Sequence, residues 1–134
     1  MKAVIDANIL FAAFISSEGV TRELLFSKDL ELVSPEFLLE EIDKYRPLLK
    51  EKTGCSEVEL NIVLSAILSR IIIIPSIEYE SARPKARAIS PDPNDSEYFA
   101  LALKLSCPLW SNDKRLKSQK EVKVLSTSEI LKLS

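Results

Sequence analysis

Residues 2–14, KAVIDANILFAAF, decide the fold class of this chain. The first part, Lys2–Ile5, is a short apolar run typical of a buried strand, and residues 8–14 have the pattern of a helix. Apolar runs and helical patterns continue to alternate along the sequence, without a repeat or a low-complexity segment. Strands joined through helices require right-handed crossovers, so the alternation predicts a parallel sheet covered by helices on both faces.

The other elements follow the same alternation. Ser56 and Glu59 form a capping-box pattern before one helix, and four consecutive isoleucines, Ile71–Ile74, come after that helix. An unbroken β-branched run is typical of a strand buried on both faces, so we expect Ile71–Ile74 to be a central or near-central strand. Further strands are expected at residues 31–33, 108–110 and 122–125. Helices are expected at residues 21–26, 57–69 and 81–88, the last of them interrupted or started late by Pro84. Three more helices are expected to begin after their caps, at Ser34-Pro35 as N-cap and N1, at Asn94 and at Ser126.

Together these elements predict a three-layer α/β/α fold with a central, mostly parallel five-stranded sheet. The 134 residues are 46% hydrophobic, which is enough for one sizeable core, and no Pro-, Gly- or Ser-rich linker divides them. We therefore expect a single domain over residues 1–134.

The composition excludes several classes of site. Histidine is absent, which removes Ser-His-Asp and Cys-His catalysis and histidine-ligated zinc. Gly19 and Gly54 are the only glycines, so a glycine-rich phosphate-binding loop cannot form. Cys55 and Cys107 are too far apart for a CxxC motif, and no secretory signal precedes Asp6, so we expect a reduced, cytoplasmic setting. No membrane span is expected, and a net charge of −2 excludes a globally basic nucleic-acid binder but not a local basic patch.

Four acidic residues, Asp6, Glu41, Asp95 and Asp113, fall where a parallel sheet would gather them. Asp6 directly follows the first strand and Asp113 comes soon after the fourth, and the carboxyl ends of parallel strands open into one crevice. Asp95 lies in the first turn of its helix, where the helix dipole favours an ionised carboxylate. Clustered carboxylates repel one another unless a cation neutralises them, so the pattern predicts a site for Mg²⁺ or Mn²⁺.

Glu41 rather than Glu40 is expected at the crevice, because Glu41 borders the apolar stripe of its helix and Glu40 points nearly opposite. Each acid also has a purely structural interpretation, which the sequence leaves open. Asp6 and Asp95 would then be ordinary helix caps, Glu41 a solvated helix residue and Asp113 a turn residue.

In these acids and their surroundings the chain resembles the PIN-domain nucleases, the family that contains the VapC-type toxin ribonucleases. The resemblance covers nearly the whole length, through VIDANIL, SPEFLLEEIDKY, PDPNDSEYFALAL and SNDKRL in the family's order. It implies a PIN-like fold in which Asp6, Glu41, Asp95 and Asp113 hold one or two Mg²⁺ or Mn²⁺ ions. It also implies supporting roles for Asn8, Asp92, Ser111 and Asn112.

The resemblance further implies hydrolysis of phosphodiester bonds in single-stranded RNA, leaving a 5′-phosphate and a 3′-hydroxyl. The implied partners are the RNA, a small antitoxin protein and a second copy of the chain in a homodimer. Some apolar residues of the early helices are candidates for such an interface, with core packing as the alternative for most of them: Leu10, Phe11, Phe14, Leu24 and Phe26.

Two groups of basic residues are candidates for contacts with phosphates near the metal site. The groups are Arg83, Lys85 and Arg87 before the Asp92 turn, and Lys114, Arg115, Lys117, Lys120 and Lys123 after Asp113. A solvated face is the alternative interpretation of both groups. The sequence shows no aromatic-rich platform for bases.

Three functions remain open at this stage. The first is a metal-dependent endoribonuclease, either the toxin of a type II toxin–antitoxin pair or a stand-alone RNA-processing enzyme. The second is a small α/β module that binds Mg²⁺ and switches partners, and the third is a non-catalytic RNA-binding or assembly domain whose acids only cap helices. Metal-dependent RNA cleavage would indicate the first, labelling by acetyl phosphate the second, and a lack of metal affinity the third.

Overall fold

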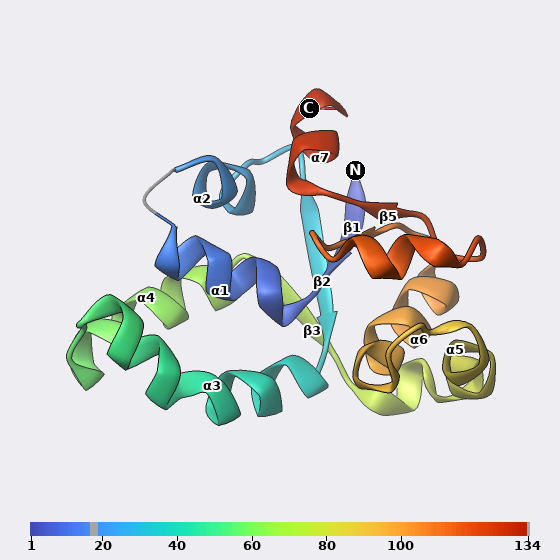
Figure 1. The fold of residues 1–134 in the computed structure, drawn as a ribbon, viewed down its shortest axis with the longest axis horizontal. Helices are drawn as coiled ribbons and strands as arrows, with labels where there is room; N and C mark the ends of the chain where they lie inside the picture. Colours follow the sequence, from blue (N-terminus) through green and yellow to red (C-terminus); the bar gives the residue numbers. More distant parts are fainter. Residues whose placement is uncertain (17–18, 134) are drawn as a thin grey trace.

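The computed structural model describes residues 1–16 and 19–133, and within them it contains one five-stranded sheet (Figure 1). The strands are β1 (Lys2–Ile5), β2 (Glu31–Pro35), β3 (Ile71–Ile74), β4 (Leu109–Trp110) and β5 (Val124–Leu125). They pair in parallel in the order β3-β2-β1-β4-β5. The expected parallel α/β sheet is confirmed, although the last two strands are shorter than the sequence suggests.

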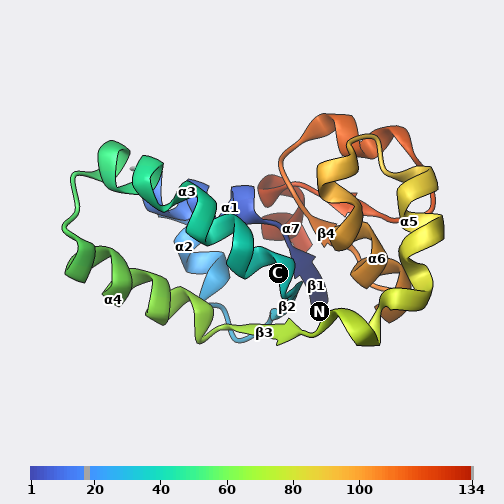
Figure 2. The same ribbon diagram turned by 90° about the horizontal axis from the view of Figure 1, so that it is seen from below.

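Helices cover both faces of the sheet (Figures 1 and 2). On one face lie α1 (Ala7–Ile15), α2 (Val20–Leu25), α3 (Phe37–Thr53), α4 (Glu57–Leu68) and α7 (Thr127–Leu133), and on the other α5 (Arg83–Ile89) and α6 (Ser96–Leu105). Short 3-10 segments occur at η1 (Ser76–Glu78), η2 (Glu80–Ala82), η3 (Pro93–Asp95) and η4 (Lys114–Ser118). This confirms the three-layer α/β/α architecture. None of the described helices is both long enough and apolar enough to cross a membrane.

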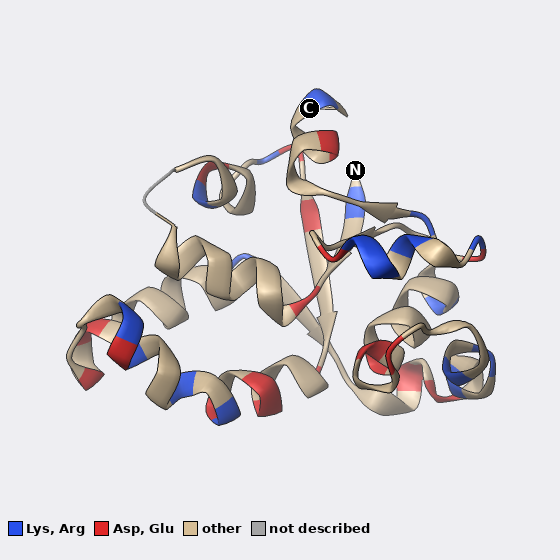
Figure 3. Ribbon diagram, in the orientation of Figure 1, with Lys and Arg blue, Asp and Glu red and all other residues tan. Residues whose placement is uncertain are grey.

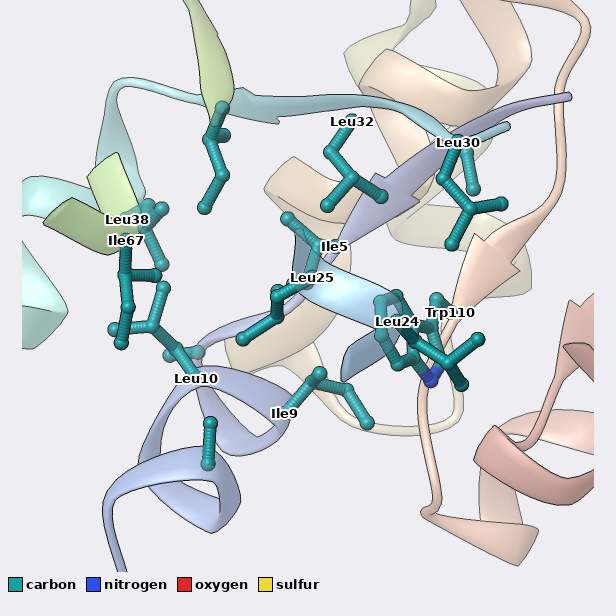
Figure 4. Packing of buried hydrophobic residues seen from close by; sticks show 14 of the residues in the cluster. Ile5, Ile9, Leu10, Leu24, Leu25, Leu30, Leu32, Leu38, Ile67 and Trp110 are labelled. Carbon is teal, nitrogen blue, oxygen red and sulfur yellow. The ribbon is translucent and has the colours of Figure 1, made fainter. Parts of the chain in front are cut away.

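Two hydrophobic cores lie on the two faces, because successive residues of a strand point to opposite sides of a sheet. In β1, Ile5 belongs to the core under α1 to α4, and Val4 belongs to the core under α6. Each fully buried aliphatic side chain contributes about 1.5–3 kcal/mol to stability, so both cores are needed to hold the sheet. Figure 4 shows the first core, where residues from separate elements meet: Ile5, Leu10, Leu25, Leu32 and Trp110.

Most of the early apolar residues considered for an interface belong to this core. Leu10 and Leu24 are buried, and Phe11 and Phe14 are partly buried against them. Phe26 is the member of the set that stays exposed.

The prediction that Ile71–Ile74 is a central or near-central strand was wrong. β3 is an edge strand that pairs with β2, and the side chain of Ile72 is 52% exposed. Only Ile71 is fully buried, while Ile73 and Ile74 are partly buried. A β-branched run favours an extended backbone, but the place of a strand in a sheet depends on which other segments return beside it. Here the chain leaves β3 for η1, and no described strand returns to its outer edge.

Ser34 and Pro35 do not start a helix as expected. They are the last residues of β2, and the Ser34 hydroxyl donates to the carbonyl oxygen of Ile5 at 2.9 Å. α3 begins two residues after Pro35, with Glu36 at its N-cap position and without a side-chain capping bond. This buried hydrogen bond joins β2 to β1. Without it the buried hydroxyl of Ser34 would be unpaired, which is costly in free energy.

The cap before α6 also differs from the prediction. Asp92, not Asn94, accepts the capping hydrogen bond: its carboxylate takes the backbone N–H of Asn94 at 3.0 Å. This bond starts η3, and α6 follows directly from η3 with Asp95 at its N-cap position. The extra 3-10 turn moves Asp95 from the first turn of the helix to its entrance.

Other local predictions are confirmed. Ser56 and Glu59 form the reciprocal capping box at the start of α4, and Ser126 and Glu129 exchange the same two bonds before α7. Gly54 ends α3 with a φ of 70°, a left-handed conformation that glycine adopts without strain.

Candidate active site

An acidic pocket of about 260 Å³ lies at the carboxyl ends of the central strands. Five carboxylates and two cationic side chains line the pocket, so the acids outnumber the bases there. Figure 3 shows acidic segments on α3 and beside the ends of the central strands, and basic segments along η4. The lining residues come from four separate parts of the chain: Asn8; Phe37, Glu40, Glu41, Lys44 and Tyr45; Asp92, Asn94 and Asp95; Asp113 and Arg115.

Asp6 lies between β1 and α1 and is 2% exposed. Its Oδ1 accepts the backbone N–H of Ile9 at 3.1 Å, so it does cap α1. Its Oδ2, however, is buried and has no hydrogen-bond partner among the described residues. Burial raises the pKa of Asp6 to about 6; the Ser111 hydroxyl and the Ile9 N–H oppose this rise, and Glu41 and Asp113 add to it. A cap requires only one oxygen, so the second oxygen is available to a ligand.

Asp95 is half-buried at the N-cap position of α6 and makes no side-chain capping bond. Burial raises its pKa to about 7, and the negative charges of Asp6, Asp92, Asp113 and Glu41 raise it further. The structure therefore gives no support to a capping role for Asp95. Its pKa instead responds to the charges of four neighbouring acids.

Glu41 lies on α3 with a half-buried side chain, whereas Glu40 is exposed, as the helical geometry predicts. The Tyr98 hydroxyl donates to Oε1 of Glu41 at 2.5 Å. Burial raises the pKa of Glu41, and the Tyr98 hydrogen bond and the charge of Lys44 oppose the rise. Tyr98 is a site residue that the sequence analysis missed. The available signal was a Tyr in a buried helix, since a buried phenol needs a hydrogen-bond partner.

Asp113 lies at the N-cap position of η4 and binds Arg115 twice through its side chain. Arg115 Nη2 is 2.8 Å from Oδ2, and Arg115 Nε is 3.1 Å from Oδ1. Oδ1 also accepts the backbone N–H of Arg115 at 3.0 Å. Arg115 holds the pKa of Asp113 below its usual range. The turn role considered for Asp113 is thus present, together with a side chain that faces the pocket.

The four residues proposed to support the site are not all brought to it. Asn8 and Asp92 line the pocket. Ser111 is buried, lies close enough to Asp6 to lower its pKa, and accepts the backbone N–H of Asp113 at 3.2 Å. Asn112 instead accepts the backbone N–H of Thr127 at 2.8 Å and so ties the connection between β4 and η4 to α7. It does not line the pocket, because consecutive residues after a strand point to opposite sides.

Most of the basic candidates do not line the acidic pocket. Arg83 pairs with Glu97 at 3.2 Å, Lys85 with Glu121 at 3.1 Å, and Lys117 with Glu129. Arg87, Lys114, Lys120 and Lys123 are exposed and form no ion pair among the described residues. Of the two basic groups, Arg115 is the member that lines the pocket.

Two aromatic residues reach the pocket, although the sequence suggested no aromatic platform. Phe37 and Tyr45 are partly buried on α3 and line the pocket beside Glu41. Each is held edge-on by a second ring, Phe37 by Tyr98 at 6.0 Å and Tyr45 by Phe11 at 5.3 Å between centroids. Fixed, partly exposed rings are suitable partners for stacking with bases.

The carboxylates fit a hard divalent cation by their chemistry. Within residues 1–16 and 19–133, no three Asp, Glu or Cys side chains lie close enough together to hold a metal ion. Yet Glu41 and Asp113 are near enough to raise the pKa of Asp6, and Asp6, Glu41 and Asp113 are near enough to raise that of Asp95. Asp6 Oδ2 also lacks a partner among the described residues. In this arrangement Arg115 binds both oxygens of Asp113, the kind of ligand that a hard divalent cation prefers.

Comparison with known proteins gives a consistent result. A family model described as PIN domain matches residues 4–132. No curated protein sequence matches the chain. A chain in the crystal structure of VapBC2 from Rickettsia felis, bound to a DNA fragment from their promoter, is similar with a TM-score of 0.67 and 18% sequence identity, covering 94% of this chain and 98% of that chain. At this identity the likeness shows a shared fold.

Proposed function

Because the chain belongs to the PIN-domain family, we propose that it is a metal-dependent endoribonuclease that hydrolyses phosphodiester bonds of single-stranded RNA. We further propose Mg²⁺ or Mn²⁺ as the cofactor, and residues 1–134 as a single PIN-like domain. The family is one of nucleases, which supports the reaction class. The acidic pocket, with rings of Phe37 and Tyr45 beside it, supports a metal site next to unpaired bases.

One observation carries the proposal: Asp6 keeps a buried carboxylate oxygen without a partner, at the bottom of a group of acids. A buried, unpaired carboxylate oxygen costs several kcal/mol unless the charge is neutralised, by a proton or by a cation. Structural roles alone do not account for the convergence of Asp6 with Glu41, Asp95 and Asp113 from distant segments. A hard divalent ion accounts for their convergence.

The roles of the residues follow from their positions. Asp6, Asp95 and Asp113 would supply carboxylate oxygens to the ion. Tyr98 fixes Oε1 of Glu41 and thereby orients the rest of that carboxylate toward the pocket. When bound, such an ion would activate a water molecule and offset the charge of the scissile phosphate. Asn8, exposed at the rim, would orient water.

The proposed partners are the RNA, an antitoxin protein and a second copy of the chain. The similar fold of a chain in VapBC2 supports a role as the toxin of a type II toxin–antitoxin pair. A homodimer has a candidate surface on α4, where Val58 and Ile62 are 67% and 65% exposed on adjacent turns. The cytoplasm, where RNA and a newly made antitoxin meet, is the proposed location.

The test is cleavage of end-labelled single-stranded RNA with and without Mg²⁺ or Mn²⁺. We expect cleavage only with metal, and a loss of roughly 100-fold or more in rate for Asp95→Asn. Asp43→Asn is the matched control, because Asp43 is an exposed acid of α3 outside the pocket and should behave as the wild type. Equal rates for both variants, or cleavage in the presence of excess chelator, would refute the proposal. Cleavage of single-stranded DNA but not RNA would retain the nuclease and change its substrate.

A further inference from the structure

Arg115 occupies an unusual position in the acidic pocket. Two cationic side chains line the pocket, Arg115 and Lys44, but only Arg115 forms an ion pair there among the described residues. Its Nη2 is 2.8 Å from Asp113 Oδ2 and 3.9 Å from Asp92 Oδ2. The guanidinium thus lies between two acids that approach the pocket from different segments, η3 and η4.

The local backbone sets up this contact. Asp113 ends the connection from β4 and caps η4, and Arg115 follows two residues later on the first turn of η4. The backbone N–H and the guanidinium of Arg115 therefore reach the same carboxylate. A planar guanidinium binds both oxygens of a carboxylate, so Asp113 has its two oxygens occupied.

The exposure of the two side chains allows the ion pair between Arg115 and Asp113 to open. The Arg115 side chain is 73% exposed, while that of Asp113 is 21% exposed. An exposed ion pair is only weakly stabilising, because water solvates the freed charge. The guanidinium can move out to solvent, whereas the carboxylate stays in the pocket.

We propose that Arg115 is a built-in counter-cation of the acidic pocket, which holds Asp113 in the metal-free protein and must release it when a divalent cation binds. This inference rests on the proposed function of the pocket as a metal site. Both oxygens of Asp113 are bound by the guanidinium, so this contact has to open before Asp113 can bind a cation. It also means that Arg115 and the metal compete, so Arg115 sets how much free metal the protein needs.

Mn²⁺ titration followed by electron paramagnetic resonance tests the competition directly. We expect Arg115→Gln to bind Mn²⁺ about three- to tenfold more tightly than the wild type, since binding no longer breaks an ion pair. Lys44→Gln is the matched control, because it removes the same charge from the same pocket without breaking a bond to a carboxylate. Arg115→Lys, which keeps the charge but loses the two-pronged contact, should fall between the wild type and Arg115→Gln.

A second measurement follows Arg115 itself. In the NMR spectrum of the ¹⁵N-labelled protein, the Nε–H signal of Arg115 reports the hydrogen bond to Asp113 Oδ1 in the absence of metal. It should shift and broaden on addition of Mg²⁺, at the concentration that saturates the backbone signals of Asp95.

The outcomes separate this inference from the proposed function. If no variant binds Mn²⁺, both are overturned. If the wild type binds Mn²⁺ but Arg115→Gln binds no more tightly than Lys44→Gln, the competition is overturned and the metal site stands. An Arg115 signal unaffected by saturating Mg²⁺ would overturn the release of Asp113.

Discussion

At the scale of single residues, the two oxygens of Asp6 have different surroundings. Oδ1 accepts the N–H of Ile9 and caps α1, and Oδ2 is buried without a partner. The capping role of this residue is therefore observed for Oδ1, and the proposed metal-binding role concerns Oδ2. A substitution that keeps the cap and removes the charge can separate them.

Asp6→Asn is that substitution. Asn caps helices as well as Asp does. Its neutral amide also avoids the cost of burying a negative charge, the cost that raises the pKa of Asp6 to about 6. We expect the metal-free variant to gain about 1–2 kcal/mol in free energy of unfolding near neutral pH, and to lose metal binding. Urea unfolding and Mn²⁺ titration check the two effects. A less stable variant that still binds Mn²⁺ would show that Asp6 is only a cap.

Tyr98 is the second residue with a separable role. Tyr98→Phe removes the hydroxyl that favours the charged form of Glu41, so the pKa of Glu41 should rise further. A carboxylate with a higher pKa stays protonated to higher pH, and the acidic limb of the cleavage–pH profile should therefore move upward. Tyr45→Phe is the control, because the Tyr45 hydroxyl makes no hydrogen bond among the described residues and its ring also lines the pocket. A profile that moves equally in both variants would contradict the positioning role.

At the scale of the elements, the connections after β1, β2 and β4 deliver the acids. Each connection leaves the carboxyl end of a strand and enters a helix or 3-10 segment at the pocket: α1, α3 and η4. The 3-10 turn η3 adds Asp92 and Asp95 from the other layer. Helix entrances are suitable for carboxylates, since free backbone N–H groups and the helix dipole favour negative charge.

The capping box of α4 allows a test of how far the cap, compared with the packing of its buried face, stabilises this helix. Ser56 and Glu59 exchange two hydrogen bonds at 3.1 and 3.2 Å, so Ser56→Ala should cost about 1 kcal/mol of stability. Ser65→Ala, an exposed position inside α4, is the matched control and should be neutral or slightly stabilising, since Ala is the better helix former. Thermal unfolding of both variants measures the difference. Equal midpoints would mean that α4 is held by its buried face alone.

At the scale of the whole molecule, folding gathers carboxylates whose pKa it raises. The pKa of Asp6 rises to about 6 and that of Asp95 to about 7, and the pKa of Glu41 also rises. Between about pH 5 and 7, above the range in which the carboxyl groups with lowered pKa titrate, these three acids therefore hold more protons in the folded protein than in the unfolded chain. The free energy of unfolding of the metal-free protein should fall as the pH rises through this window, and then level off.

A divalent ion should reverse this loss. At about pH 7.5, where the acids are charged, excess Mg²⁺ or Mn²⁺ binds the folded state only and should raise the melting temperature. At about pH 4.5, where Asp6 and Asp95 are protonated, the same addition should have little effect. Melting curves over this range, with K⁺ at matched ionic strength as the control, check the prediction. Equal metal effects at both pH values would place the bound ion outside the pocket.

The sequence by itself determined the class of the fold and predicted four acids for one site. Alternating periodicity was sufficient for the parallel α/β sheet, because it reports which side chains a strand or helix buries. Caps such as Ser56 and Ser126 could be predicted, since a cap and the N–H it binds are a few residues apart. The resemblance of the motifs to the PIN-domain family was confirmed by the match over residues 4–132.

Only the tertiary structure decided the edge position of β3, the hydrogen bond from Tyr98 to Glu41, and the place of Arg115 among the acids. Tyr98 and Glu41 are 57 positions apart, and no local pattern relates them. Strand order and side-chain partners are set by the packing of distant segments against two shared cores. The free energy of such contacts is a property of the assembled fold, which local periodicity does not contain.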